Sequence, residues 1–228
     1  MRFSAYPAYR LTGSEVLRTV PTHWGVKRGR YCVQVNPRLE HWRDLPGDTE
    51  VSFVPMEAIG EYGGIRVEAT RPLEEAGTGY SQFQDGDVVV AKITPCFENG
   101  KGALAAGLVN GVAFGTTELH VLRPNPTILS RYLFYLSISS AFRRAGEAEM
   151  YGAGGQKRIP SAFIKDFPVP VPPLDEQRAI ADFLDDRLAT IDRINAALGA
   201  PVPILHEYRA AVITAAVTGQ IDVRGAAQ

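Results

Sequence analysis

Residues 169–181 read VPVPPLDEQRAIA, and they mark the point at which the chain changes character. The prolines of residues 168–173 restrict the backbone and remove N–H donors, so this stretch is expected to be extended, as a linker or an edge strand. Asp175 and Glu176 follow directly, where negative side chains suit the start of a helix. The sequence therefore predicts an extended connector over residues 168–174 and a helical region over residues 175–222.

The helical region carries an apolar stripe at three- and four-residue spacing. Such a stripe is typical of a seam between paired helices, and it equally suits a helix packed on its own domain. Gly199, Pro201 and Pro203 interrupt the stripe, so we expect a break near 199–203 between helices of about 24 and 16 residues, as a kink or a hairpin. The candidate interface residues are Ile180, Leu184, Leu188, Ile191, Ile194, Leu198, Leu205 and Val212.

Before the connector, residues 1–167 are rich in glycine, aromatic residues and short β-branched runs. The predicted strands are 51–56, 87–93 and 119–122, with 65–68 and 111–115 as less regular candidates. The predicted helices are 128–139, 141–149 and 161–167. The fold class expected from this order is α+β: one mixed domain with at least four strands, followed by a long, coiled-coil-like helical region.

The overall composition excludes several classes of protein. With 228 residues, 45% hydrophobic content and a net charge of −1, the chain is not expected to be disordered or to be a simple polycation. No stretch has the roughly 18 apolar residues of a membrane span, and we expect no secretory signal. Two cysteines, Cys32 and Cys96, without CxxC spacing indicate a reducing cytoplasm.

The familiar catalytic motifs are missing from the sequence. There is no GxSxG nucleophile motif, no GxxxxGK[ST] phosphate loop, and no acidic residue two positions before any lysine. The four histidines are far apart, and none lies at metal-site spacing from a cysteine. We therefore expect no catalytic residue, no metal and no cofactor.

Residues 151–160, YGAGGQKRIP, form the most distinctive polar segment. Glycines such as Gly154 allow close backbone approach to a ligand, Gln156 can pair with adenine, and Arg158 can bind guanine or phosphate. Lys157 adds a compact charge that suits phosphate. The segment is either a flexible connector or, as we favour, a set of DNA contacts.

Two further loops carry side chains that can read a DNA groove. One leaves the strand predicted over 87–93, and the other precedes the strand predicted over 119–122. Both also suit ordinary turns, such as one at Asn99-Gly100. Their candidate DNA-binding residues are Lys92, Thr94, Asn99, Lys101, Thr116 and Thr117.

Taken together, these segments resemble the DNA specificity subunits of type I restriction-modification systems. The resemblance covers nearly the whole chain. It rests on residues 6–9 (YPAY), 20–24 (VPTHW), 86–89 (GDVV), 154–159 (GGQKRI), 169–181 and 215–222 (AAVTGQID).

The resemblance implies a target recognition domain over residues 1–167 that reads half of a split site in double-stranded DNA. A full-length subunit of that family has two such domains and two helical regions, which pack antiparallel and dock methyltransferase subunits. A motor-nuclease restriction subunit joins for cleavage, and the specificity subunit itself catalyses nothing. One recognition domain and one helical region make this chain similar to a half-subunit.

A half-subunit of this kind is expected to form a homodimer, or a dimer with another half-subunit, through its helices. A helix of about 24 residues spans about 36 Å, close to one turn of DNA. Two alternatives stay open: a helical adaptor or regulator that does not bind DNA, and the specificity partner of a fused methyltransferase-nuclease. Charge is unevenly divided, with a balance of +2 over residues 1–167 and −3 over residues 168–228, so near-neutrality does not exclude DNA binding.

Overall fold

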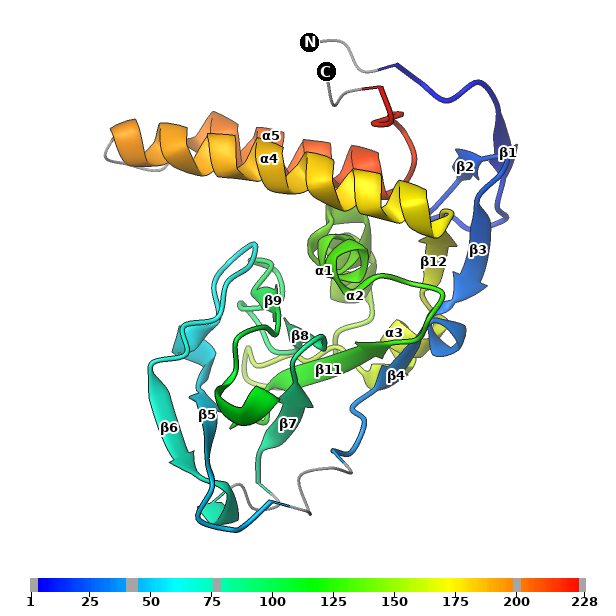
Figure 1. Cartoon of the computed structure of the whole chain (residues 1–228). Helices are drawn as coiled ribbons and strands as arrows, with labels where there is room; N and C mark the ends of the chain where they lie inside the picture. The colour runs from blue at the N-terminus through cyan, green and yellow to red at the C-terminus, as the bar shows by residue number, and fades with distance from the viewer. Residues whose placement is uncertain (1–3, 40–44, 76–78, 199–201, 226–228) are drawn as a thin grey trace.

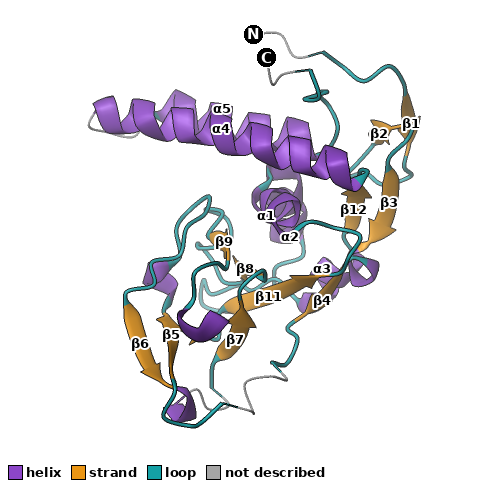
Figure 2. Cartoon of the chain, viewed as in Figure 1, coloured by secondary structure: helices purple, strands orange, loops and turns teal. Residues whose placement is uncertain are grey.

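The computed structural model describes residues 4–39, 45–75, 79–198 and 202–225. A helical hairpin lies along one side of the molecule, with two shorter helices beneath it and the main sheets below those (Figure 1). Strands dominate the part away from the hairpin (Figure 2). The α+β fold class predicted from the sequence is confirmed by this mixture of helices and sheets.

Two four-stranded sheets form the lower part of the molecule. The first has the order β4 (Val33–Val35), β11 (Leu119–Pro124), β8 (Val88–Ala91) and β9 (Gly102–Leu104). The second has the order β6 (Ala69–Pro72), β5 (Glu50–Val54), β10 (Val112–Gly115) and β7 (Ser81–Gln84). Strands β5 and β10 run parallel, whereas the other neighbours are antiparallel.

The strands predicted near residues 51–56, 87–93, 111–115 and 119–122 are confirmed as β5, β8, β10 and β11. The strand predicted at 65–68 is wrong. Within that stretch Ile65 forms only an isolated bridge to Ile59, and β6 begins at Ala69. The helices predicted near 128–139, 141–149 and 161–167 are confirmed as α1 (Ser130–Ile138), α2 (Ser140–Ala148) and α3 (Ser161–Asp166).

The proline-rich connector forms strand β12 (Pro168–Val171), antiparallel to β3 (Gly25–Arg28). A separate pair, β1 (Tyr9–Leu11) with β2 (Thr19–Pro21), lies beside it (Figure 1). Strand β12 pairs on one side only. Its prolines, which have no N–H to donate, are tolerated because the other side needs no hydrogen-bond donor. Of the two interpretations of this stretch, the edge strand is confirmed.

Glu176 joins the start of α4 (Leu174–Leu198) to the N-terminal segment. Its carboxylate is buried, with 4% of the residue exposed, and accepts hydrogen bonds from the Tyr6 hydroxyl and, at 3.1 Å, from Trp24 Nε1. His23 Nε2 lies 2.9 Å from its second oxygen. Burial, and then the bond to Glu176, raise the pKa of Tyr6, so this hydroxyl stays protonated and donates. We call these four residues the Glu176 latch.

Gln177 makes a second connection at the same turn of α4. Its Oε1 accepts the Leu129 N–H at 2.8 Å, which satisfies a backbone donor at the start of α1. Its Nε2 donates to the carbonyl oxygens of Thr127 and Pro172, at 3.0 and 2.9 Å. Glu176 and Gln177 therefore fix α4 against the N-terminal segment and α1, respectively.

The predicted interruption of the helical region is confirmed. Helix α4 has 25 residues, and α5 (Pro203–Val217) has 15 and returns alongside it as a hairpin (Figure 1). Arg209 of α5 donates to Asp192 of α4, which ties the two helices together. Gly199 and Pro201, which carried part of the prediction, lie outside the described residues.

The hairpin packs on its own chain along most of the apolar stripe. Ile180, Leu184, Leu188, Ile191 and Val212 are all buried in one core cluster with side chains of α1 and α2. This corrects the expectation that the whole stripe pairs with a partner, because buried side chains cannot also contact a second chain. Within the described residues, no helix combines the length and apolarity that a bilayer crossing needs.

Candidate nucleic-acid interface

The glycine-rich segment folds into a small exposed hairpin. Tyr151 and Arg158 exchange two backbone hydrogen bonds, of 3.2 and 2.9 Å, and Gln156 N–H donates to the Ala153 carbonyl. Gly154 has φ +63, a conformation that glycine adopts without strain. Residues 152–157 are all exposed, so this hairpin, which we call the 152–157 loop, presents Gln156 and Lys157 to solvent.

Backbone hydrogen bonds attach the 152–157 loop to the end of β8. Ile159 N–H donates to the Lys92 carbonyl at 2.9 Å, and Thr94 N–H donates to the Lys157 carbonyl at 3.0 Å. The Thr94 hydroxyl donates to the Gly155 carbonyl and accepts from Lys157 N–H. The structure thus brings Lys92 and Thr94 to the loop as one unit, but Thr94 uses its hydroxyl within the chain.

Arg158 forms a bidentate ion pair with Glu118. Nε and Nη2 each lie 2.8 Å from a different carboxylate oxygen. The hydrogen bond from Arg158 holds the pKa of the Glu118 carboxyl below its usual range, so the carboxylate stays ionised. The neighbouring Thr116 accepts the Glu118 N–H at 3.2 Å, and Thr117 is exposed. The 116–118 turn and the 152–157 loop therefore meet at this ion pair.

His120 lies buried behind the ion pair and links two walls of the site. Its Nε2 lies 3.0 Å from the Ile159 carbonyl, which can only accept, so Nε2 carries the proton. Its Nδ1 then accepts from Asn36 Nδ2 at 3.2 Å. Burial lowers the pKa of His120, which agrees with a neutral ring.

A groove of about 320 Å³ opens beside this cluster. Two of its lining residues, Lys92 and Thr117, belong to the candidate set. Sequence reasoning missed the others, because the groove is assembled from segments that are far apart in the chain. Its polar and aromatic lining includes Asn36, Arg38, Tyr80, Gln82, Lys92 and Thr117.

Among the described residues, the side chains of Asn99 and Lys101 have their hydrogen-bond partners outside this cluster. Asn99 Nδ2 donates to Glu61 Oε1 at 3.1 Å, and Lys101 Nζ donates to the Met56 carbonyl at 3.3 Å. Both residues hold the turn after β8 against residues 56–61. The candidate DNA-binding set therefore divides into a cluster around the 152–157 loop and a pair with contacts of its own.

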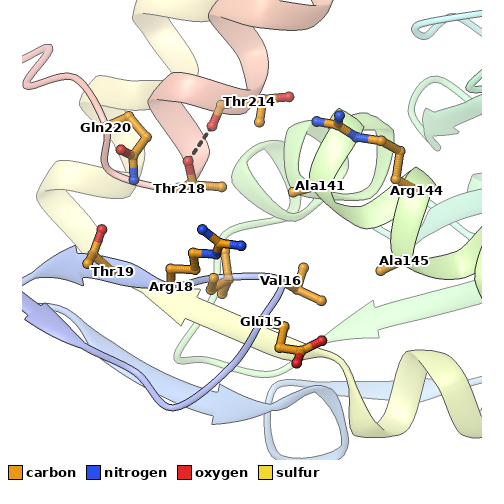
Figure 3. Close-up of a pocket in the computed structure, with 11 residues that line it drawn as sticks. Glu15, Val16, Arg18, Thr19, Ala141, Arg144, Ala145, Thr214, Thr218 and Gln220 are labelled. Atoms are coloured by element: carbon orange, nitrogen blue, oxygen red, sulfur yellow. Dashed lines mark hydrogen bonds between the residues drawn. The ribbon is translucent and has the colours of Figure 1, made fainter.

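A larger hollow of about 740 Å³ lies on another part of the molecule, between the loop of residues 15–19, α2 and the end of α5 (Figure 3). Arg18 and Arg144 reach it from different walls, with Val16 and Ala141 between them. Thr214 of α5 accepts the Ser140 N–H at 2.9 Å, and the hydroxyl of Thr218, just after α5, donates to the Thr214 carbonyl at 2.7 Å. None of the candidate DNA-binding residues lines this hollow.

The comparison with protein families matches residues 73–199 to the type I restriction modification DNA specificity domain. That stretch is more than half of the chain, and it contains β8, the 116–118 turn, the 152–157 loop and α4. The chain belongs to this family.

Two curated relatives are specificity subunits of type I restriction enzymes from Escherichia coli. The chain is 39% identical to the EcoAI specificity subunit over 71% of its own length and 27% of the relative. It is 36% identical to the EcoEI specificity subunit over 82% of its length and 32% of the relative. The chain thus spans about a third or less of the length of these relatives.

The fold is also similar to that of a solved specificity subunit. The HsdS subunit from Thermoanaerobacter tengcongensis aligns with a TM-score of 0.61 at 22% identity, over 78% of this chain and 46% of that one. The expected type I specificity family and the expected non-catalytic class are both supported by these matches. The individual DNA contacts and the pairing through helices stay predictions.

Proposed function

We propose that this chain supplies one DNA-reading unit of a type I restriction-modification complex. The observation that carries the proposal is the 152–157 loop: a fully exposed hairpin with Gln156 and Lys157 at its end, fixed by backbone bonds to β8 and set beside a groove. Rigid placement of polar side chains on an exposed loop suits base and phosphate contact. The methyltransferase and restriction subunits are its proposed partners.

The Lys157→Ala variant tests this proposal. We expect it to weaken binding to a duplex pool evenly across sequences, and to reduce the slope of log K against log salt by about one, because one phosphate contact is lost. Fluorescence anisotropy over a salt series measures both quantities.

Lys27→Ala provides the matched control, because Lys27 is also an exposed lysine but lies on β3, which pairs with β12 and not with β8, the strand to which the loop is attached. We expect its slope to equal that of the wild type. Equal slopes for Lys157→Ala and wild type would contradict the proposed role of the loop. Failure of the wild type to bind any duplex, with retained binding to a methyltransferase subunit, would favour the adaptor alternative.

The pairing surface that we propose is the free end of the α4–α5 hairpin. Ile194 and Leu198 on α4, and Ile204 and Tyr208 on α5, are large and exposed, with 61% of Leu198 and 69% of Ile204 accessible. Neighbouring exposed apolar side chains favour association. A second copy would bury the same end symmetrically, and the aligned region makes up 46% of the solved relative, which leaves room in that chain for a second such unit.

We expect the double variant Leu198→Asp with Ile204→Asp to sediment as a monomer at concentrations where the wild type is a dimer. Charges placed on this end would be desolvated in the paired state. Ala196→Asp is the control, because residue 196 is exposed and lies about 200° around the helix from Ile194 and Leu198. A monomeric wild type, with or without a methyltransferase subunit, would contradict the pairing.

A further inference from the structure

The guanidinium of Arg158 has two edges that can each make a pair of parallel hydrogen bonds. Glu118 occupies the edge formed by Nε and Nη2, with both contacts at 2.8 Å. The other edge includes Nη1, which donates to no group in the described part of the chain. That second edge is the one a ligand could bind without displacing Glu118.

The position of Arg158 is set by its backbone as well as by Glu118. Arg158 forms antiparallel bridges with both Tyr151 and Ile93, so it lies between two extended segments. Its side chain is 39% exposed, whereas that of Glu118 is 25% exposed. The carboxylate therefore supports the guanidinium from the protein side and leaves it open toward solvent.

Charge distinguishes the ligands that this edge would take. A guanidinium paired with a carboxylate has no net charge as a unit, so its attraction for a phosphate is reduced. The O6 and N7 atoms of guanine are neutral acceptors that need two correctly placed N–H donors. Lys157 and Lys92, which have no such carboxylate pair in the described residues, suit phosphates better.

We propose that Glu118 is a positioning residue that presents Arg158 to the O6 and N7 atoms of one guanine in the DNA major groove. The proposal rests on the DNA-reading function proposed above and adds to it one read base pair and the residue that orients its reader. Lys92 and His120 also face Glu118, but neither donates to its carboxylate in the described structure.

The test begins with duplexes of randomised sequence, from which those retained by the wild-type chain are selected. We expect one position at which guanine is required. Replacing that guanine with 7-deazaguanine, which lacks N7, should lower wild-type affinity about tenfold, the order expected for one bidentate base contact. Arg158→Ala should show that lower affinity with ordinary guanine and no further loss with the analogue.

Glu118→Gln separates positioning from a merely structural role. We expect the guanine preference to fall, while affinity for unrelated duplexes rises and the salt slope increases by about one, because the released guanidinium can bind phosphate. Glu118→Asp should restore part of the preference. Glu61→Gln, at an exposed carboxylate bonded to Asn99, is the control and should keep the wild-type values.

The outcomes distinguish this inference from the proposed function. A selected site whose affinity is unchanged by 7-deazaguanine at every guanine would overturn the inference and leave DNA reading intact. A Glu118→Gln protein that keeps the full guanine preference would also overturn it. Selection of no duplex by the folded wild type would overturn the proposed function itself.

Discussion

Replacing Glu176 with alanine is expected to lower the free energy of unfolding by about 3–5 kcal/mol, the usual cost of removing one partner from a buried charged pair or network. The change leaves the Trp24 indole N–H and the Tyr6 hydroxyl buried without an acceptor. It also removes the partner of His23. Urea denaturation followed by circular dichroism measures the loss as a lower midpoint at similar slope.

Asp175→Ala is the matched control for this prediction. Asp175 precedes Glu176 in the first turn of α4 but is exposed, so we expect a loss of only about 0.3–1 kcal/mol from the helix dipole. Similar losses for the two variants would show that the carboxylates act through the helix terminus alone. The Glu176 latch would then not be a stabilising network.

Much of the fold could be predicted because its signals are local. The proline run and the following DEQ triplet place the start of α4 correctly, and the interruption near residue 203 separates α5. Strand β8 is a continuous apolar run and β11 begins with four buried residues, and short runs rich in Val and Leu that are bounded by turn residues indicate strands locally.

Strands β3, β4 and β9 could not be predicted in this way. Each has only three or four residues; β3 and β4 depend on partners that are remote in sequence, as β3 pairs with β12 across about 140 residues, whereas β9 pairs with the nearby β8. Whether the apolar stripe packs on its own domain or forms a seam with a partner helix also depends on residues remote in sequence. Ile180 and Leu184 are buried because α1 lies across them, and nothing in the stripe itself indicates α1.

The candidate site likewise combines features that local sequence predicts with features that depend on remote partners. The exposure of the 152–157 loop follows from its glycines, which local sequence displays. The pairing of Arg158 with Glu118 joins residues 40 apart and depends on how β11 enters the sheet beside β8. The register between β11 and β8 decides which cation lies beside Glu118 and is neutralised by it. Residue type alone therefore could not separate Arg158 from Lys157.

Gly219→Ala is expected to lower the free energy of unfolding by about 2–5 kcal/mol, from left-handed backbone strain and from overpacking. Gly219 follows α5 with φ +72, the left-handed conformation that is common just after the end of a helix. A Cβ there would lie 2.4 Å from Pro21 Cδ and 3.0 Å from Trp24 Cζ3. Because Trp24 belongs to the Glu176 latch, the segment that follows α5 packs directly on the contacts that fix the start of α4.

Gly13→Ala separates the two contributions. Gly13 has φ +77, but a Cβ there meets nothing within 4 Å, so we expect only the strain, about 1–2 kcal/mol. The excess loss at Gly219 then measures the cost of moving Pro21 and Trp24. A loss at Gly219 no larger than that at Gly13 would mean that the segments around residues 21 and 219 move apart to accommodate the added methyl group at little free-energy cost. The latch would then connect α4 to the N-terminal segment without the support of α5.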